Sequence, residues 1–199
     1  QDGNTMVMTA RSDHALANDF DGAAYVFVRS GTSWSMQQKI QASIAEQSAA
    51  KFGESCDMSW DGNTIAIGSH RCNTNSGAVF VFTRSGSTWT QEQKIQPTDI
   101  AQQDLFAINV GISGDGNTIV AGSYNEDNGS FLSAGALYAF SRSGSTWSQK
   151  IKLYSSDSAS DDEFGYGVAI AKDDGTVIAG ARFEDASGVR SGSAYVFTA

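Results

Sequence analysis

The chain reads Asp-Gly-Asn-Thr-Ile-Ala-Ile-Gly over residues 61–68 and Asp-Gly-Asn-Thr-Ile-Val-Ala-Gly over residues 115–122. An altered version follows at 173–180, and residues 2–8 hold a further copy that begins with the same Asp-Gly-Asn-Thr. Gly and Asn supply the positive φ that a tight hairpin turn requires, and the apolar run behind them favours a β-strand. The sequence therefore predicts repeats in which a turn leads into a strand.

Each repeat is long enough for a four-stranded sheet. The turn aspartates Asp2, Asp61, Asp115 and Asp173 lie 59, 54 and 58 residues apart. An aromatic-led strand precedes the turn, and a third strand after a polar loop has aromatic residues two apart, as in Val-Phe-Val-Phe at 79–82. Both faces of such a sheet are apolar, so each sheet needs a neighbour on either side.

A fourth strand carries a tryptophan and ends in Lys-Ile. Trp34 and Trp89 stand five residues before the lysine, whereas the third copy places Lys150-Ile151 only three residues after Trp147. We interpret this as a loss of two residues, which leaves every side chain on its original face.

These features predict an all-β fold, a β-propeller built from about four four-stranded antiparallel blades. The blades form a single domain over residues 1–199, with repeats at approximately 1–45, 46–99, 100–155 and 156–199. The first copy lacks its first strand and the fourth lacks its last, so the end blades are incomplete. Three arrangements stay open: a small closed ring, part of a longer array, or a subunit whose open strand edges pair with other copies.

The amino-acid composition limits the classes of partner that we expect for this chain. The formal net charge is −9 and the basic residues are scattered, which argues against a nucleic-acid partner. No apolar run is long enough for a membrane-spanning helix, and the chain opens without a signal region, as in a processed form or a fragment.

Two pairs of short motifs resemble the FG-GAP repeats of integrin α-subunit propellers. They are Phe52-Gly53 with Gly68-Ser69-His70, and Phe164-Gly165 with Gly180-Ala181-Arg182; the third copy departs with Phe106-Ala107. The resemblance covers essentially the whole chain. It implies the propeller fold, a location outside the cell or at its surface, and a role in adhesion or ligand binding.

Integrin-type blades often bind calcium in an acidic loop, but the matching positions here are tight turns. A two-residue turn offers too few oxygens for calcium, so the calcium site is not carried over and the turn aspartates are predicted to bond their own backbone. Two other loops contain enough oxygen for a cation. They are Asn125, Glu126, Asp127 and Asn128, and a second group of Asp13, Asn18, Asp19 and Asp21. Neither has the spacing of a known calcium loop, so we expect solvated surface and no cofactor, with calcium as the alternative.

Cys56 and Cys72 are the only cysteines. A disulfide between them suits an extracellular chain, and two free thiols packed as small apolar groups are the alternative.

Two further residues are candidates for surface chemistry. Trp60 stands at a turn where the other copies have Gly114 or Lys172, and it is a candidate ligand contact, with cover for its own hairpin as the other interpretation. Asn128 begins the only glycosylation sequon, Asn-Gly-Ser.

We therefore expect an extracellular structural or adhesive module that contacts other proteins or copies of itself through open blade edges, as a subunit of an oligomer or filament would. A glycan-binding module that uses loop carboxylates and Trp60 is the alternative. A carbohydrate-active hydrolase or lyase ranks last, because neither histidine falls in a metal-ligand pattern and no catalytic motif is present.

Overall fold

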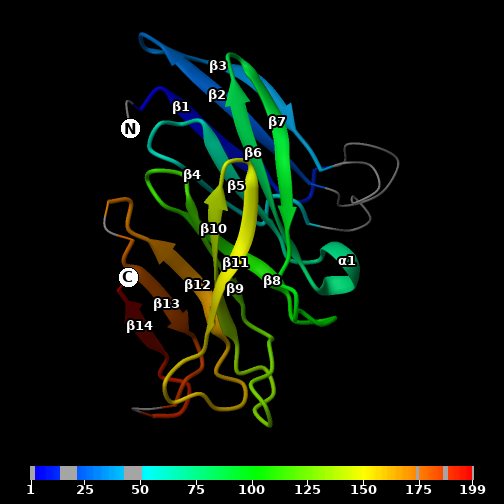
Figure 1. Cartoon of the computed structure of the whole chain (residues 1–199), viewed down its shortest axis with the longest axis vertical. Coiled ribbons are helices and arrows are strands. Elements are labelled where there is room, and N and C mark those ends of the chain that lie inside the picture. The colour runs from blue at the N-terminus through cyan, green and yellow to red at the C-terminus, as the bar shows by residue number, and fades with distance from the viewer. Residues whose placement is uncertain (1–2, 14–21, 43–50, 174, 186–187, 199) are drawn as a thin grey trace.

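The computed structural model describes residues 3–13, 22–42, 51–173, 175–185 and 188–198. Its strands form four antiparallel sheets, two of four strands and two of three, which we name blades 1 to 4 in chain order (Figure 1). Blade 1 contains β1 (Thr5–Ala10), β2 (Ala23–Ser30) and β3 (Ser33–Ile40); blade 2 contains β4 (Ser55–Met58), β5 (Thr64–Ser69), β6 (Ala78–Ser85) and β7 (Thr88–Ile95). Blade 3 contains β8 (Phe106–Ile112), β9 (Thr118–Ser123), β10 (Ala136–Ser143) and β11 (Thr146–Leu153); blade 4 contains β12 (Phe164–Ile170), β13 (Val177–Ala181) and β14 (Ser193–Phe197).

The predicted all-β architecture with incomplete end blades is confirmed. In blades 2 and 3 the four strands pair in chain order, while blade 1 begins with the second type of strand and blade 4 ends with the third. The helical turn α1 (Cys72–Asn75) lies in a loop of blade 2. Among the described residues, no helix is both long and apolar enough to cross a bilayer.

The Asp-Gly-Asn-Thr stretches form the expected hairpin turns. In blade 3 the Asp115 carboxylate accepts hydrogen bonds from the Ser113 hydroxyl at 2.5 Å and from the Asn117 backbone N–H at 3.0 Å, and Gly116 adopts a φ of 71°. These bonds to the ionised form lower the pKa of Asp115 below its ordinary value. Asp61 makes the same contacts in blade 2. The prediction that the turn aspartates bond their own turn is confirmed for Asp61 and Asp115, whereas Asp2 lies outside the described residues.

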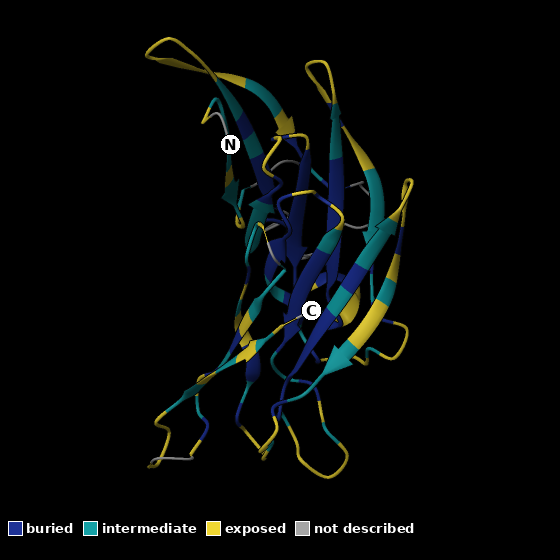
Figure 2. Ribbon diagram, turned by 60° about the vertical axis from the view of Figure 1, so that its left-hand side comes forward, coloured by how far each residue is buried: buried dark blue, intermediate teal, exposed yellow. Residues whose placement is uncertain are grey.

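Each blade has two different apolar faces. On blade 3 the aromatic face carries Phe106, Tyr138 and Phe140, and it packs against the small-residue face of blade 2, which carries Ala66 and Val81. The Phe106 and Tyr138 rings meet edge to face with centroids 5.5 Å apart, a favourable aromatic geometry. Blades 1 and 2, and blades 3 and 4, join in the same way. The buried residues therefore run through the strands of all four blades, with exposed hairpin tips (Figure 2).

Neighbouring blades approach closely at the glycine near the end of the second type of strand. A Cβ placed on Gly122 of blade 3 would lie 1.7 Å from the backbone oxygen of Gly165 in blade 4. Gly68 of blade 2 faces Ala107 of blade 3 in the same way, at 2.4 Å. The glycine in the second strand is therefore required by the backbone of the following blade.

One strand prediction is wrong. The register pairs Tyr138 with Lys152, as it pairs Phe80 with Lys94, so the counterpart of Lys94 is Lys152 and not Lys150. Lys152 stands five residues after Trp147, as in the other blades, and nothing was lost. Lys150 instead occupies the bulge, the unpaired position that Glu92 holds in blade 2.

The blades form an open series. Neighbouring blades contact one another through their inner strands in the order β1, β4, β8, β12. The aromatic face of blade 1 and the small-residue face of blade 4 are both exposed, so these two blades do not cover each other. The structure therefore does not form the small closed ring, which was one of the three arrangements that the sequence left open.

Candidate functional site

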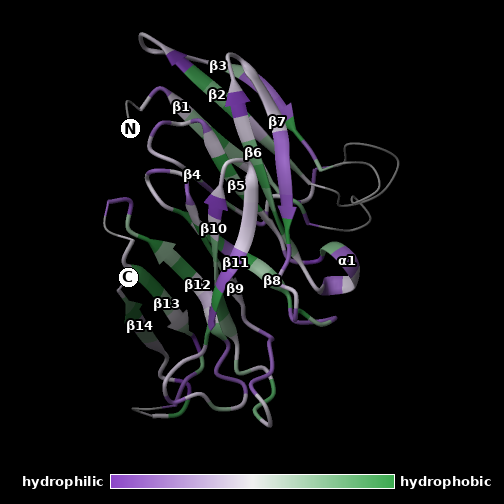
Figure 3. Cartoon of the chain, viewed as in Figure 1, coloured by the Kyte–Doolittle hydropathy of each residue, from purple (hydrophilic) through white to green (hydrophobic). Residues whose placement is uncertain are grey.

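The small-residue face of blade 4 has no blade over it. Ile178 is 48% exposed and Val196 62%. Their counterparts within the series are buried, with Val120 of blade 3 at 1% and Val81 of blade 2 at 0%. Figure 3 shows the hydrophobic character of β13 and β14, which lie at the margin of the molecule. Exposed apolar surface of this kind makes this face a candidate interaction site.

A cavity of about 410 Å³ lies on this face, lined by Tyr166, Gly167, Gly180, Ala181, Arg182, Gly192, Ser193 and Ala194. Gly180 is the counterpart of Gly122, yet the nearest atoms to a Cβ placed there are the Ser193 and Gly167 oxygens of its own blade, at 3.8 and 3.9 Å. The space that Gly165 fills against Gly122 is therefore open at Gly180. At the joint between blades 3 and 4 the equivalent space is filled by Gly165 of the Phe164-Gly165 pair, and we call the open cavity at Gly180 the socket.

An arginine held among aromatic rings borders the socket. The Arg182 guanidinium lies 3.9 Å from the centre of the Tyr166 ring and donates a 2.5 Å hydrogen bond to Glu163. This hydrogen bond raises the pKa of Arg182. Tyr124 of blade 3 meets Tyr166 edge to face at 5.4 Å, so the rim connects the last two blades.

The aromatic face of blade 1 is the second uncovered face. Met8 is 54% and Met36 58% exposed, and Trp34 is 42% exposed. Tyr25 and Phe27 are half-buried, whereas their counterparts in blades 2 and 3 are buried. The two ends of the series therefore present the two complementary types of face.

The structure brings the first predicted cation loop together, but its oxygens bond within the protein. Asp127 accepts from the Ser133 backbone N–H at 2.9 Å, and Asn125 accepts from the Ser133 hydroxyl at 3.0 Å. Glu126 is buried and lies 2.5 Å from the Lys152 ammonium. Burial raises the pKa of Glu126 to about 7, against the opposing effect of Lys152.

The second predicted loop is described only at Asp13, which pairs with the Lys39 ammonium at 2.9 Å. Asn18, Asp19 and Asp21 lie outside the described residues. Within the part of the chain that the structure describes, no three His, Cys, Asp or Glu side chains gather as they would around a metal ion. Calcium at these loops stays a prediction.

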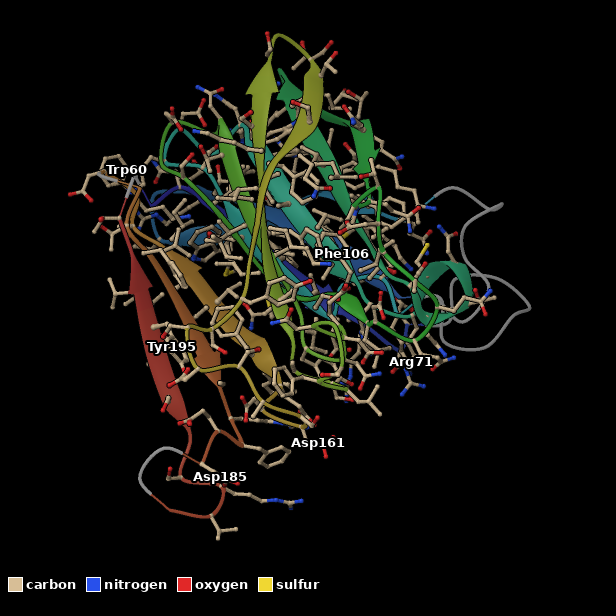
Figure 4. The ribbon with its side chains drawn as sticks, turned by 60° about the horizontal axis from the view of Figure 1, so that its bottom comes forward. Trp60, Arg71, Phe106, Asp161, Asp185 and Tyr195 are labelled. Carbon is tan, nitrogen blue, oxygen red and sulfur yellow. The ribbon has the colours of Figure 1, made fainter. Side chains whose placement is uncertain are left out.

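Trp60 is 47% exposed, and its side chain projects from the surface (Figure 4). Its backbone N–H donates to the Gly114 oxygen at 2.9 Å, and the Gly114 N–H donates to the Lys172 oxygen at 3.0 Å. The three matching turns of blades 2, 3 and 4 are thus joined in a row. Its role as a ligand contact stays a prediction.

Cys56 and Cys72 are free thiols in the structure, the first half-buried and the second buried. Both thiols are free in the structure, as in the alternative of small apolar groups, and a disulfide between them stays a prediction. Burial raises the pKa of the Cys56 thiol, which keeps it protonated and unreactive. Asn128 is half-buried next to exposed Gly129 and Ser130; glycosylation there stays a prediction.

A set of three side chains, a tyrosine, an acid and a lysine, recurs in blades 1 and 3 and was not predicted from the sequence. In blade 3 the Tyr138 hydroxyl donates to Glu126, and the Lys152 ammonium lies over the Tyr138 ring at 5.2 Å. In blade 1, Tyr25 donates to Asp13 and Lys39 lies over the Tyr25 ring at 5.4 Å.

Blade 2 lacks both the acid and the hydroxyl of this set. It has Phe80 in place of the tyrosine and Cys72 in place of the acid, while Lys94 donates to Asn73. Each acid of this set stands four residues after one fixed position of the second type of strand, the position that Gly68 and Gly122 hold in blades 2 and 3. This constant spacing is the signal by which the sequence could have revealed the set.

Comparisons with known proteins agree with this architecture. The model of the family described as FG-GAP repeat matches residues 89–140 and 147–197, together just over half of the chain. No curated protein sequence matches the chain. The crystal structure of TolB from Acinetobacter baumannii is similar to this fold, with a TM-score of 0.54 and 15% sequence identity over 98% of this chain. This chain corresponds to 39% of the length of TolB, so the likeness concerns the fold alone.

Proposed function

Because this chain belongs to the FG-GAP repeat family, we propose that it is an extracellular structural or adhesive β-propeller module. It acts through protein–protein contacts, and it is not an enzyme. The observation that supports this proposal is the exposure of one aromatic face and one small-residue face at opposite ends of the blade series. The same two types of face are buried against each other at all three joints inside the molecule.

The exposed faces have the chemistry that those joints use. At the joint between blades 3 and 4, Val120 of the small-residue face and Phe164 of the aromatic face are both fully buried. Ile178 on blade 4 is the counterpart of Val120, and Phe27 on blade 1 is the counterpart of Phe140 of blade 3; blade 1 lacks the first type of strand and so has no counterpart of Phe164. Burying apolar area contributes about 25 cal/mol per Å², so covering these faces favours association.

The proposed contact between two copies joins two different surfaces, one from each copy. The blade 4 face of one copy receives the blade 1 face of the next, and the resulting pair still has one free face of each type. Such a heterologous contact continues until it closes into a ring or extends as a filament.

Sedimentation velocity over a range of concentrations tests the proposal. The wild-type chain is expected to form species larger than a monomer as concentration rises, and Ile178→Asp or Met36→Asp is expected to suppress them. Both positions are exposed, so circular dichroism should show an unchanged fold. Ser145→Asp, at the exposed tip of the blade 3 hairpin, adds the same charge away from both faces and should leave association unchanged. A wild-type chain that stays monomeric, or equal loss with all three variants, would contradict the proposal.

A further inference from the structure

His70 in blade 2 is a buried histidine with a ring nitrogen that has no hydrogen-bond partner. It directly follows β5, and only 6% of the residue is exposed. Its Nδ1 atom lies 3.6 Å from the Glu54 Oε2 atom, and both atoms are buried and without a partner. This separation is too long for a hydrogen bond. Buried polar atoms are nearly always bonded in folded proteins, so two unbonded atoms that face each other are exceptional.

The two side chains lie at the joint between blades 1 and 2. Gly53, the neighbour of Glu54, approaches blade 1 so closely that a Cβ placed on it would lie 3.0 Å from the Thr9 side chain. The second carboxylate oxygen of Glu54, Oε1, accepts a 2.7 Å hydrogen bond from the Arg11 guanidinium at the end of β1. Glu54 therefore forms an ion pair across the joint on one side and faces His70 on the other.

The surroundings of His70 oppose a positive charge on its ring. Burial is the main cause that lowers the pKa of His70 below its ordinary value, and Glu54 acts in the opposite direction. Three cations add to the effect of burial. They are Arg71 in the same loop, Arg11 in blade 1 and Lys51 in the segment before β4. At neutral pH the ring is therefore uncharged, and it gains a proton only when the solution becomes acidic.

Blades 3 and 4 have different side chains at these two positions. Glu54 stands two residues after the phenylalanine of its blade, and His70 stands two residues after Gly68. The equivalent of Glu54 is Ile108 in blade 3 and Tyr166 in blade 4, and the equivalent of His70 is Tyr124 or Arg182. Tyrosine, arginine and isoleucine side chains ordinarily keep their charge between pH 5 and 8, whereas histidine changes it there. A response to mild acid at these positions is therefore specific to the joint between blades 1 and 2.

We propose that His70 is a pH-sensitive switch that releases blade 1 from blade 2 when its ring is protonated. Protonation places a further cation in a buried site that three cations already surround, which is unfavourable. The imidazolium also attracts the Glu54 carboxylate away from Arg11, and this weakens the ion pair across the joint. Separation of blade 1 then exposes the aromatic face of blade 2, which is buried in the joint at neutral pH. The switch lies inside one chain and does not depend on the proposed contact between copies.

The first test is urea unfolding of the wild type and of His70→Phe at pH 7.5 and pH 5.5. Above the ordinary pKa of 6.5 the ring is neutral in both states; below it the unfolded chain binds the proton more readily, so stability is lost as pH falls. The unfolding constant of the wild type should therefore rise by up to about tenfold more than that of His70→Phe. His14→Phe removes the other histidine of the chain and should leave this difference unchanged.

Two measurements on the dilute wild-type chain keep the test decisive if His70→Phe does not fold. Titration of the histidine rings followed by NMR should give His70 a pKa below 6.5. Hydrogen exchange, corrected for its intrinsic dependence on pH, should show protection lost at pH 5.5 over β1 and β4 and retained over β9 and β10. The proposal is overturned by a His70 pKa of 6.5 or above, by equal acid responses of the wild type and His70→Phe, or by uniform loss of protection over the four blades.

Discussion

At the scale of single residues, Gly122 and Gly180 hold the same position in their blades but have different surroundings. A Cβ on Gly122 collides with the backbone of blade 4, whereas a Cβ on Gly180 makes only ordinary contacts with oxygens of its own blade, at 3.8 and 3.9 Å. Gly122→Ala should therefore lower the free energy of unfolding by about 3 kcal/mol or more, at the upper end of overpacking. Gly180→Ala should leave it unchanged or raise it by up to about 1 kcal/mol, because alanine restricts the unfolded chain. Urea denaturation of both variants measures the difference, and equal effects would contradict the joint geometry.

The turn aspartate gives a prediction about pH. The folded-state pKa of Asp115 is lowered, so its contribution to stability is present above the ordinary pKa of 3.8 and is lost as pH falls through the folded value. Asp115→Ala should cost about 1 kcal/mol at pH 7, as the loss of a side-chain cap does. Asp115→Asn keeps an acceptor oxygen and should show less loss of stability than wild type below pH 4. Urea unfolding from pH 2 to 7 tests this, and an unchanged acid profile in both variants would contradict it.

Residue-level reasoning from the sequence succeeded where both partners are close in the chain. Asp115 and its donors Ser113 and Asn117 are neighbours, so the turn was predictable from composition. For Glu126 the sequence favoured solvated surface, with a cation as the alternative, and did not reveal its partner Lys152, which lies 26 residues further along the chain. The register of β10 with β11 is what brings Lys152 to Glu126.

At the scale of elements, the fourth-strand tryptophan stabilises a blade only when another blade precedes it. Trp89 is 3% exposed and donates its indole N–H to Gln37 of blade 1 at 3.0 Å, while Trp34 is 42% exposed. Trp89→Ala should lower the free energy of unfolding by about 3–5 kcal/mol, and Trp34→Ala by less than about 1 kcal/mol. Thermal and urea unfolding of the two variants provide the comparison. Similar losses would mean that tryptophan stabilises its own strand and not the joint.

The strands themselves were largely predictable, because alternating aromatic residues and hairpin turns give both the strand order and the repeat length. The Trp-to-Lys spacing in blade 3 was misjudged because the sequence offers two lysines and does not display a bulge. The partner of Ala139 is Ile151 and that of Phe140 is Gln149, which leaves Lys150 outside the register. Backbone irregularities that depend on pairing with another strand have no local signature.

At the scale of the whole molecule, the two exposed faces predict association with a direction. Ile178→Asp blocks the blade 4 face and keeps the blade 1 face, while Met36→Asp does the reverse. Neither variant alone should associate, yet an equimolar mixture should form a heterodimer and stop there, since its remaining faces are both blocked. Light scattering after size-exclusion chromatography measures the mass. A mixture that stays monomeric, or that grows beyond the dimer, would contradict head-to-tail contact.

Each joint between blades places a phenylalanine backbone over a glycine of the preceding unit, with Gly22 under Phe52, Gly77 under Phe106 and Gly135 under Phe164. An inserted copy of one unit would therefore find a compatible neighbour before it and another behind it. Tandem duplication could lengthen such a gene, and unequal recombination shorten it, without a single compensating substitution. Variation in unit number is then an evolutionarily easy change, whereas a change in the chemistry of the joint must occur in every unit at once.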